Sequence, residues 1–433
     1  MKGTLSCTSL FNTVTNCLGK VKGSKLRAGS ISLQDCLLSG YALFSLKYPS
    51  LLQFEQHIDE GKMIEYNLKS MYGIEDIPSD TQMRERLDII EPKQLRRLFT
   101  SLLAQCQRSK RLELFKYYDN RYLVPLDGTG YFYSKEVHCN QCCEKRHRDG
   151  SIGYYHQILS AAIVHPGQKV VLPFAPEPIM KTDGLSKNDA EHNAGKRFLA
   201  DLKREHPHLK IIITGDGLYA DGPFIKLLKQ DGHCFILVAK EGNHKALFEE
   251  FRALPKQTYE IKEGAITHKF AWANDHILND SHQDCLVNVL EYWEEHASGF
   301  VQHWVWVTDF KLTQKNVYQI MKGGRARHKI ENETFNTLKN QGYQFEHNFG
   351  HGNKNLSTVF AYLMLVAFFV DQLQQLGCKL FTKALARLKS KKNLWERKRS
   401  YFFNHFISRL EDLWSALAYG HVGKPLDYII NTS

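Results

Sequence analysis

The sequence has no apolar run long enough to cross a membrane. Its longest, Val359–Val370, spans 12 residues, whereas a membrane helix needs about 20, so we expect a buried helix instead. Residues 1–27 also lack the apolar stretch of a secretory signal. The ten cysteines are scattered apart from one cluster, which disfavours a disulfide scaffold. These absences predict a reduced protein of the cytoplasm with no membrane partner.

Acidic residues are outnumbered by basic ones. The chain of 433 residues has 57 Lys and Arg against 46 Asp and Glu, a net charge of +11. Such a balance favours a polyanionic partner, nucleic acid first. The segment 379–409 is the most one-sided, with basic side chains and the single acid Glu396. It is either a solvated helix face or a surface that contacts DNA phosphates, and we favour the second.

The hydrophobic pattern of the sequence, and with it the predicted secondary structure, changes several times along the chain. A hydrophobic content of 43% excludes wholesale disorder, and the length suggests two to four domains or one core with appendages. Strands and helices alternate in the middle, which predicts an α/β core interrupted by alternating, solvent-facing strands. We predict five parts: a helical DNA-binding domain (1–118), a catalytic core in two pieces (119–240 and 305–372), an inserted β subdomain (241–304) and a basic helical C-terminal region (373–433).

Two aspartates follow apolar strands in this core. Asp127 ends Tyr122–Asp127, Asp216 ends Leu209–Asp216, and each has glycine neighbours that let a ligand approach closely. Carboxylates at the ends of neighbouring strands can share Mg²⁺ ions, which prefer oxygen ligands and leave positions open for phosphate oxygens. Two such ions can stabilise both the attacking and the leaving oxygen when a phosphodiester is displaced in line. Asp221 is a rival to Asp216, but we interpret it as the cap of the next helix.

A third carboxylate is needed to complete such a site. In the helix that contains RHKIENETFNTLK, Ile330 belongs to the inward stripe, Glu331 lies at its edge and Glu333 points towards solvent. We therefore choose Glu331 as the ligand and Arg327, one turn earlier, as its neighbour and phosphate contact. Asp309, at the end of another apolar strand, is the rival third ligand.

These motifs resemble a known family. Asp127 in LDGTGYF, Asp216 in IIITGDGLYAD and the helix RHKIENETFNTLK are similar to the DDE transposases of bacterial insertion sequences, in the group with a β insertion and a Y-(2)-R-(3)-E-(6)-K signature. The resemblance implies a ribonuclease-H-like mixed sheet, and catalysis by Asp127, Asp216 and Glu331 with two Mg²⁺ ions, replaceable by Mn²⁺. It also implies cut-and-paste chemistry on double-stranded DNA, namely terminal inverted repeats and a target, by a homodimer associated with the bacterial nucleoid.

The signature is only partly kept. Arg327 and Glu331 satisfy R-(3)-E, but Gly324 stands at the tyrosine position. The lysine position is Leu338, and Lys339 comes one residue late, about 100° around a regular helix. Either the helix carries a local bulge, or Lys339 reaches the DNA phosphate in another way. Two other functions stay open: a nuclease without strand transfer, and an inactive relative that only binds DNA.

One cysteine cluster has the spacing of metal ligands. Cys139, Cys142 and Cys143 are followed by His147, which gives C-x₂-C and an imidazole nearby. A second C-x₂-C pair is missing, so we favour a reduced loop without metal over a zinc site. His351, in a later polar segment, could approach DNA, but polar loop histidines are common.

Overall fold

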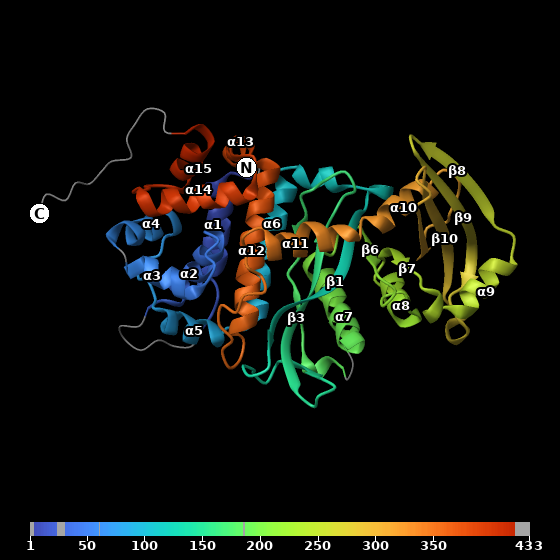
Figure 1. The fold of residues 1–433 in the computed structure, drawn as a ribbon, viewed down its shortest axis with the longest axis horizontal. Helices are drawn as coiled ribbons and strands as arrows, with labels where there is room; N and C mark the ends of the chain where they lie inside the picture. The colour runs from blue at the N-terminus through green and yellow to red at the C-terminus, as the bar shows by residue number, and fades with distance from the viewer. Residues whose placement is uncertain (1–3, 24–30, 60, 185–186, 421–433) are drawn as a thin grey trace, which may run out of the picture.

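The computed structural model describes residues 4–23, 31–59, 61–184 and 187–420. The end of the predicted C-terminal region, 421–433, lies outside these residues. The fold is mixed α/β: one large sheet runs through the centre and right of Figure 1, and helices from both ends of the chain gather on the left. The predicted fold class is confirmed, while the domain boundaries stay predictions.

The first part of the chain is helical, as its sequence predicts. Apolar side chains such as Leu37, Leu68 and Leu102 recur on the inner faces and are fully buried. Ser79 caps its helix through a capping box with Gln82, which satisfies two backbone N–H groups at the helix start. The helices are α1 (Cys7–Leu18), α2 (Leu33–Ser45), α3 (Leu51–Asp59), α4 (Lys62–Tyr72), α5 (Asp80–Asp88) and α6 (Arg96–Arg108).

The central sheet combines parallel and antiparallel strands. The strands β1 (Tyr122–Ser134), β6 (Ile211–Gly215) and β7 (Cys234–Val238) are parallel neighbours. β3 (Ile152–Ile163) pairs antiparallel with the outer side of β1. All five residues of β6 are buried, as expected of a strand that is covered on both faces. This order and these directions are the ribonuclease-H-like mixed core that the resemblance implies.

One predicted strand end is wrong. β1 does not stop at Asp127 but continues to Ser134, because β3 goes on pairing with it beyond the last partner that β6 offers. The pairing with β6 ends at Pro125, and a bulge lies between Gly130 and Phe132. Asp127 therefore lies where β1 leaves the parallel pair and continues as one arm of an antiparallel ribbon.

The segment predicted as an insertion is built of antiparallel strands. They are β8 (Gln257–Glu263), β9 (Ile266–Ile277) and β10 (Leu286–His296), preceded by helix α9 (Lys245–Ala253). Through β11 (Val301–Thr308), which pairs with both β10 and β7, they extend the core sheet. They form the right-hand end of the molecule in Figure 1. The short strands β2 (Cys143–Arg146), β4 (Leu172–Pro173) and β5 (Glu177–Ile179) pair with β3.

Helices after the sheet complete the core. α12 (Leu356–Gly377) has the length and the mean hydropathy, 1.8, of a membrane span, but its apolar window is entirely buried in the protein. The predicted buried helix at Val359–Val370 is thus confirmed. The other helices that follow the first strands are α7 (Lys187–Glu205), α8 (Gly222–Gln230), α10 (Val317–Arg325), the π-helical turn η7 (Ile330–Phe335) and α11 (Asn336–Asn340).

The last helices return to the first ones. They are α13 (Lys379–Leu388), α14 (Lys391–Asn404) and α15 (Leu410–Tyr419). Lys47 Nζ lies 2.7 Å from Asp371 Oδ2, and Lys398 Nζ donates to the backbone oxygen of Ser45 at 2.8 Å. Lys398 is only 2% exposed, so not every basic residue of the C-terminal helices can face DNA.

Candidate active site

The two predicted aspartates lie beside each other. In the parallel pair of β1 and β6, Pro125 is opposite Thr214, and two residues further along each chain come Asp127 and Asp216. The carboxyl ends of parallel neighbours meet at one edge of a sheet, where functional side chains commonly gather. Asp216 Oδ1 accepts a hydrogen bond from the backbone N–H of Leu218 at 2.9 Å. This bond holds the Asp216 side chain in the turn that follows β6.

Arg327 joins the third predicted carboxylate to the first. Its Nη1 lies 3.5 Å from Asp127 Oδ2, and its Nη2 lies 2.9 Å from Glu331 Oε1. Because Arg327 and Glu331 are four residues apart, they lie on the same side of the helical segment. The structure thus brings Asp127, Asp216, Arg327 and Glu331 to one place from three distant parts of the chain.

The charge balance of this place is unfavourable without a cation in addition to Arg327. Burial raises the pKa of Asp127 to about 7, Arg327 opposes this rise, and the negative charges of Glu331, Glu191 and Asp216 add to it. A half-buried carboxyl surrounded by other carboxyls is stabilised by positive charge. The donor set, carboxylate oxygens only, suits Mg²⁺ or Mn²⁺. Among the described residues, however, the three acids are not drawn into a cluster as tight as 4.8 Å.

Glu191 is a further carboxylate that the sequence interpretation missed. It lies on α7, is 9% exposed and accepts a hydrogen bond from Tyr219 Oη at 3.0 Å. A Cβ placed on Gly128 would come within 2.5 Å of Glu191 Oε2, so Gly128 makes room for this side chain next to Asp127. The only signal in the sequence is the position of Glu191 beside Ala190 and Ala194 on the inward face of its helix.

The offset of Lys339 has a structural cause. The turn η7, from Ile330 to Phe335, is π-helical, and a π turn accommodates one extra residue. A local bulge, one of the two predicted explanations, therefore lies between Glu331 and Lys339. Lys339 Nζ pairs with Glu346 at 2.6 Å, and its side chain lines a groove of about 850 Å³ with Lys145 and other residues of β1, β2 and β3.

The missing tyrosine also has a structural cause. A Cβ on Gly324 would lie 2.6 Å from Nε1 of Trp306, which is buried in β11. Such a distance is shorter than any ordinary contact, so no side chain fits at this position without moving the indole. The close packing of α10 against β11 thus excludes a tyrosine here.

The two rival aspartates have other partners. Asp309 Oδ1 accepts a hydrogen bond from the backbone N–H of Phe235 at 2.9 Å and so joins the ends of two strands. Asp221 caps α8 by accepting from the N–H of Phe224 at 2.7 Å, as predicted, and pairs with His192. Both therefore have structural tasks that account for them.

The predicted cysteine cluster needs correction. Cys143 Sγ bonds to the oxygen of Ile179, and His147 bonds to Tyr133, so neither joins the other two cysteines. Cys139 and Cys142 instead meet His156 and His351. An approach to DNA was one interpretation of His351. The structure instead places it against Cys142 Sγ, with only 7% of its surface exposed. The sequence could not show this group, because its histidines come from β3 and from the segment before α12.

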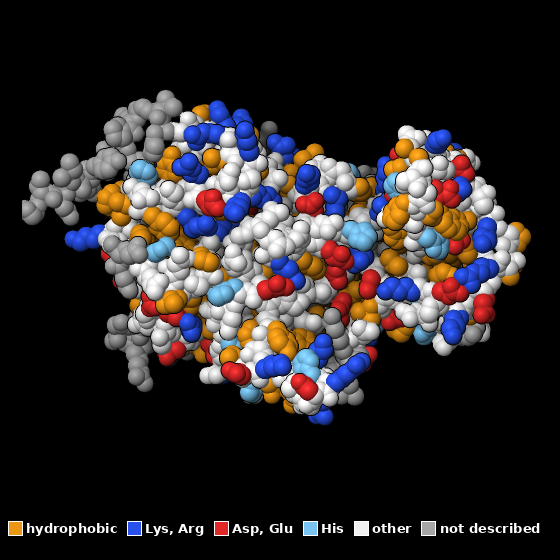
Figure 2. Space-filling view, in the orientation of Figure 1, with side chains coloured by type: hydrophobic (Ala, Val, Ile, Leu, Met, Phe, Trp, Pro, Cys, Tyr) orange, Lys and Arg blue, Asp and Glu red, His pale blue; other side chains and the backbone are white. Residues whose placement is uncertain are grey.

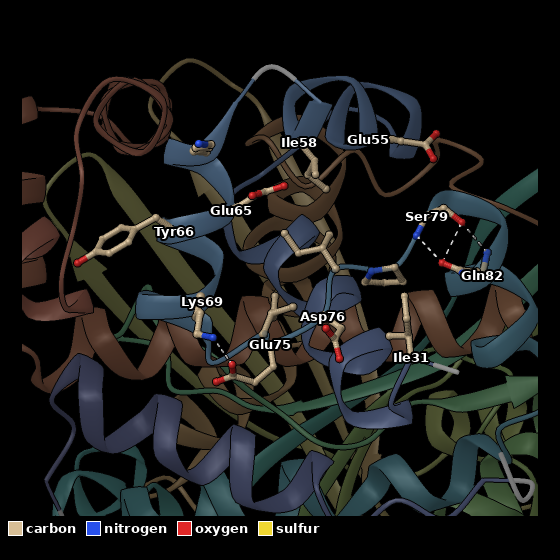
Figure 3. A pocket seen from close by; sticks show the side chains of 14 residues that line it. Ile31, Glu55, Ile58, Glu65, Tyr66, Lys69, Glu75, Asp76, Ser79 and Gln82 are labelled. Atoms are coloured by element: carbon tan, nitrogen blue, oxygen red, sulfur yellow. Dashed lines mark hydrogen bonds and ion pairs between the residues drawn. The ribbon is translucent and has the colours of Figure 1, made fainter. Parts of the chain in front are cut away.

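A large hollow lies elsewhere, in the N-terminal helices. Apolar and polar side chains line it, and its acidic residues Glu55, Glu65, Glu75 and Asp76 (Figure 3) outnumber its two lysines, which is unfavourable for a DNA phosphate. Lys69, which also lines it, is paired with Glu75. Figure 2 shows Lys and Arg side chains gathered over the helices at the upper left, and acidic side chains near the centre of the same face.

Comparisons with known proteins include a distant likeness to a solved structure. No family model and no curated protein matches the sequence. The fold is similar to that of a piggyBac transposase, determined by cryo-electron microscopy in a synaptic complex with hairpin DNA. The TM-score is 0.42 and the identity 9%, over 96% of this chain and 81% of that chain. A likeness this distant carries no argument about activity, which therefore rests on the side chains.

Proposed function

We propose that the protein is a DNA transposase that cleaves transposon ends and transfers the 3′-hydroxyl into target DNA. The observation that carries the proposal is the convergence of Asp127, Asp216 and Glu331, with Arg327 lying between Asp127 and Glu331. Phosphoryl transfer asks a protein mainly for positioning and for neutralisation of charge. Three carboxylates and a guanidinium at one edge of a rigid sheet meet both needs.

Each side chain has a task in this proposal. Asp127, Asp216 and Glu331 would hold two Mg²⁺ ions, which supply Lewis-acid activation of the attacking hydroxyl and stabilise the leaving oxygen. Arg327, released in part from the carboxylates, would contact an oxygen of the scissile phosphate. Lys339 would hold a neighbouring phosphate at the rim of its groove. Glu191, held by Tyr219 and lying against Gly128, would add negative charge beside Asp127 and so increase the attraction of the site for cations.

The partners and setting follow from the same proposal. Two transposon ends must be brought together, so we expect a homodimer on double-stranded DNA, with the exposed basic side chains of the C-terminal helices contacting phosphates. We also propose membership of the bacterial insertion-sequence group with the β insertion, and a place in the cytoplasm at the nucleoid. The motifs LDGTGYF, IIITGDGLYAD and RHKIENE support this assignment.

A strand-transfer assay separates the proposal from its alternatives. The full chain is incubated with Mg²⁺, a supercoiled target and labelled DNA that carries the inverted repeats bracketing the gene. A transposase yields joined product, a nuclease yields cleavage alone, and an inactive relative yields only a shifted band. Asp216→Ala should abolish both cleavage and joining but leave DNA binding, whereas Asp309→Ala should retain cleavage if the protein still folds. Cleavage that persists in Asp216→Ala would contradict the proposed site.

A further inference from the structure

Four potential metal ligands converge from three separate segments. Cys139 and Cys142 lie before β2, His156 lies in β3, and His351 lies before α12. One ligand atom from each lies within 4.8 Å of all the others. Among the described residues, this is the one group of three or more His, Cys, Asp or Glu side chains whose ligand atoms lie within that distance of one another. It contains no carboxylate.

The distances fit the edges of a tetrahedron. Cys139 Sγ and Cys142 Sγ are 3.9 Å apart, His156 Nε2 lies 3.5 and 3.4 Å from the two sulfurs, and His351 Nε2 lies 3.4 Å from Cys142 Sγ. With Zn–S near 2.3 Å and Zn–N near 2.0 Å, a tetrahedral zinc site has S···S edges of about 3.8 Å and S···N edges of about 3.5 Å. No side chain has to move far to enclose an ion.

The surroundings are those of a closed structural site. Cys142, His156 and His351 are 2%, 5% and 7% exposed. The backbone N–H of Cys139 donates to Cys142 Sγ at 3.4 Å, a contact that stabilises negative charge on the sulfur. The ring centroids of Phe132 and His351 lie 4.4 Å apart, so an aromatic side chain packs against this ligand. Buried polar atoms usually have firm partners, and these four ligand atoms face chiefly one another.

We propose that Cys139, Cys142, His156 and His351 bind one structural Zn²⁺ ion. Two thiolates and two imidazoles in tetrahedral array favour zinc over the hard cations of the carboxylate site. The ion would tie the loop after β1 and the middle of β3 to the segment that leads from α11 into α12. Since β1 carries Asp127 and the chain just before that segment carries Glu331, the ion would help to fix the distance between the two carboxylates.

Metal analysis tests the proposal without relying on DNA cleavage. The full chain, purified without chelators, should contain roughly one zinc per molecule by mass spectrometry of the elements, as a four-ligand site requires. Cys142→Ser should lose at least nine tenths of it. Cys143→Ser is the matched control. The sulfur of Cys143 bonds to the backbone oxygen of Ile179 and not to the cluster, so this variant should keep the metal. Wild-type protein without zinc, or full zinc in Cys142→Ser, would overturn the proposal.

Cobalt substitution keeps the test decisive if Cys142→Ser does not fold. Wild-type protein loaded with Co²⁺ should show visible bands of a four-coordinate ion and a thiolate charge-transfer band in the near ultraviolet. These bands should be the same in Asp127→Ala, because the carboxylate site takes no part. Their absence, or a disulfide between Cys139 and Cys142 in place of metal, would overturn the zinc site. Loss of DNA cleavage in Asp127→Ala with zinc retained would separate the two sites.

Discussion

The guanidinium of Arg327 lies 3.5 Å from the carboxylate of Asp127, although 200 positions separate the two residues in the chain. The same guanidinium lies 2.9 Å from Glu331. Arg327 therefore neutralises a carboxylate pair that would otherwise repel each other. In the proposed reaction, cations bound there would free the arginine for a phosphate oxygen. One side chain thus links the electrostatics of the free site to the proposed contact with DNA.

Replacing Arg327 should slow DNA cleavage without preventing DNA binding. We expect Arg327→Ala to lower the single-turnover rate on the order of 10²- to 10³-fold, as the loss of one preorganised donor does in other sites. Arg204→Ala is the control, since Arg204 is an exposed residue at the far end of α7 that pairs with Asp201. Equal rates for Arg327→Ala and the wild-type protein would remove Arg327 from the reaction.

Two glycines of β1 should respond differently to alanine. In Gly128→Ala the new Cβ would meet Glu191 Oε2 at 2.5 Å, whereas in Gly130→Ala the nearest atoms are 3.8 and 4.0 Å away. We expect Gly128→Ala to lower the free energy of unfolding by about 1–3 kcal/mol and to displace Asp127. Gly130→Ala should be neutral or slightly stabilising. Denaturant unfolding of both variants checks this, and equal stabilities would show that Glu191 yields easily.

Deleting one residue should convert the π turn to a regular helix. Asn332 is exposed within η7, so its removal takes away the extra residue and moves Lys339 to the spacing E-(6)-K. Because the π turn already absorbs that residue, we expect the deletion variant to fold and to keep cleavage within about tenfold, a change of about 1.4 kcal/mol in the barrier. Insertion of one alanine at the same place should abolish DNA cleavage. Complete inactivity of the deletion variant alongside native stability would contradict this equivalence.

Stability should rise with pH because of Lys398. Burial lowers the pKa of Lys398 from 10.5 to about 7, and the charge of Lys47 adds to this. Between these values the unfolded chain keeps the proton and the folded protein does not, so the free energy of unfolding increases as pH rises through this window, by up to about 1.4 kcal/mol per unit. Below pH 7 both states carry the proton, and the full cost of the buried charge is present.

The variant Lys398→Met isolates this effect. It should unfold at higher denaturant concentration than the wild-type protein at pH 6, and its stability should depend less on pH between 7 and 9. Lys392→Met, an exposed residue of the same helix, should leave the slope unchanged. Parallel pH curves for the wild-type protein and Lys398→Met would show that Lys398 stays protonated in the fold.

The sequence predicts best where a local pattern has one structural meaning. An apolar run followed by Asp and Gly indicates the edge of the parallel sheet, so Asp127 and Asp216 could be named and expected together, although only Asp216 follows the end of its strand. The continuation of β1 beyond Asp127 depends on β3, a partner chosen only in the folded chain. The π turn behind Lys339 could be suspected from its spacing but not located, because regular and π turns differ by one hydrogen-bond register.

Groups assembled from distant segments are the least predictable. Cys139 and Cys142 have the spacing of metal ligands, but no regular spacing connects His156 and His351 to them. Cys143 and His147 lie nearer in the sequence and were therefore grouped with the two cysteines. Glu191 was similarly hidden, since a glutamate on a helix usually faces solvent. Only the packing of α7 beside Gly128 turns it towards Asp127. Tertiary packing decides such cases.

The contacts of Lys398 with Ser45 and of Asp371 with Lys47 have a consequence for biosynthesis. The first helices are synthesised more than 300 residues before the helices that shield them, since the contacts span 324 and 353 positions. A chain truncated before α12 would therefore expose the apolar faces of the first helices, which favours degradation or aggregation. The apolar faces of the first helices are therefore covered only once α12 and α14 have been synthesised.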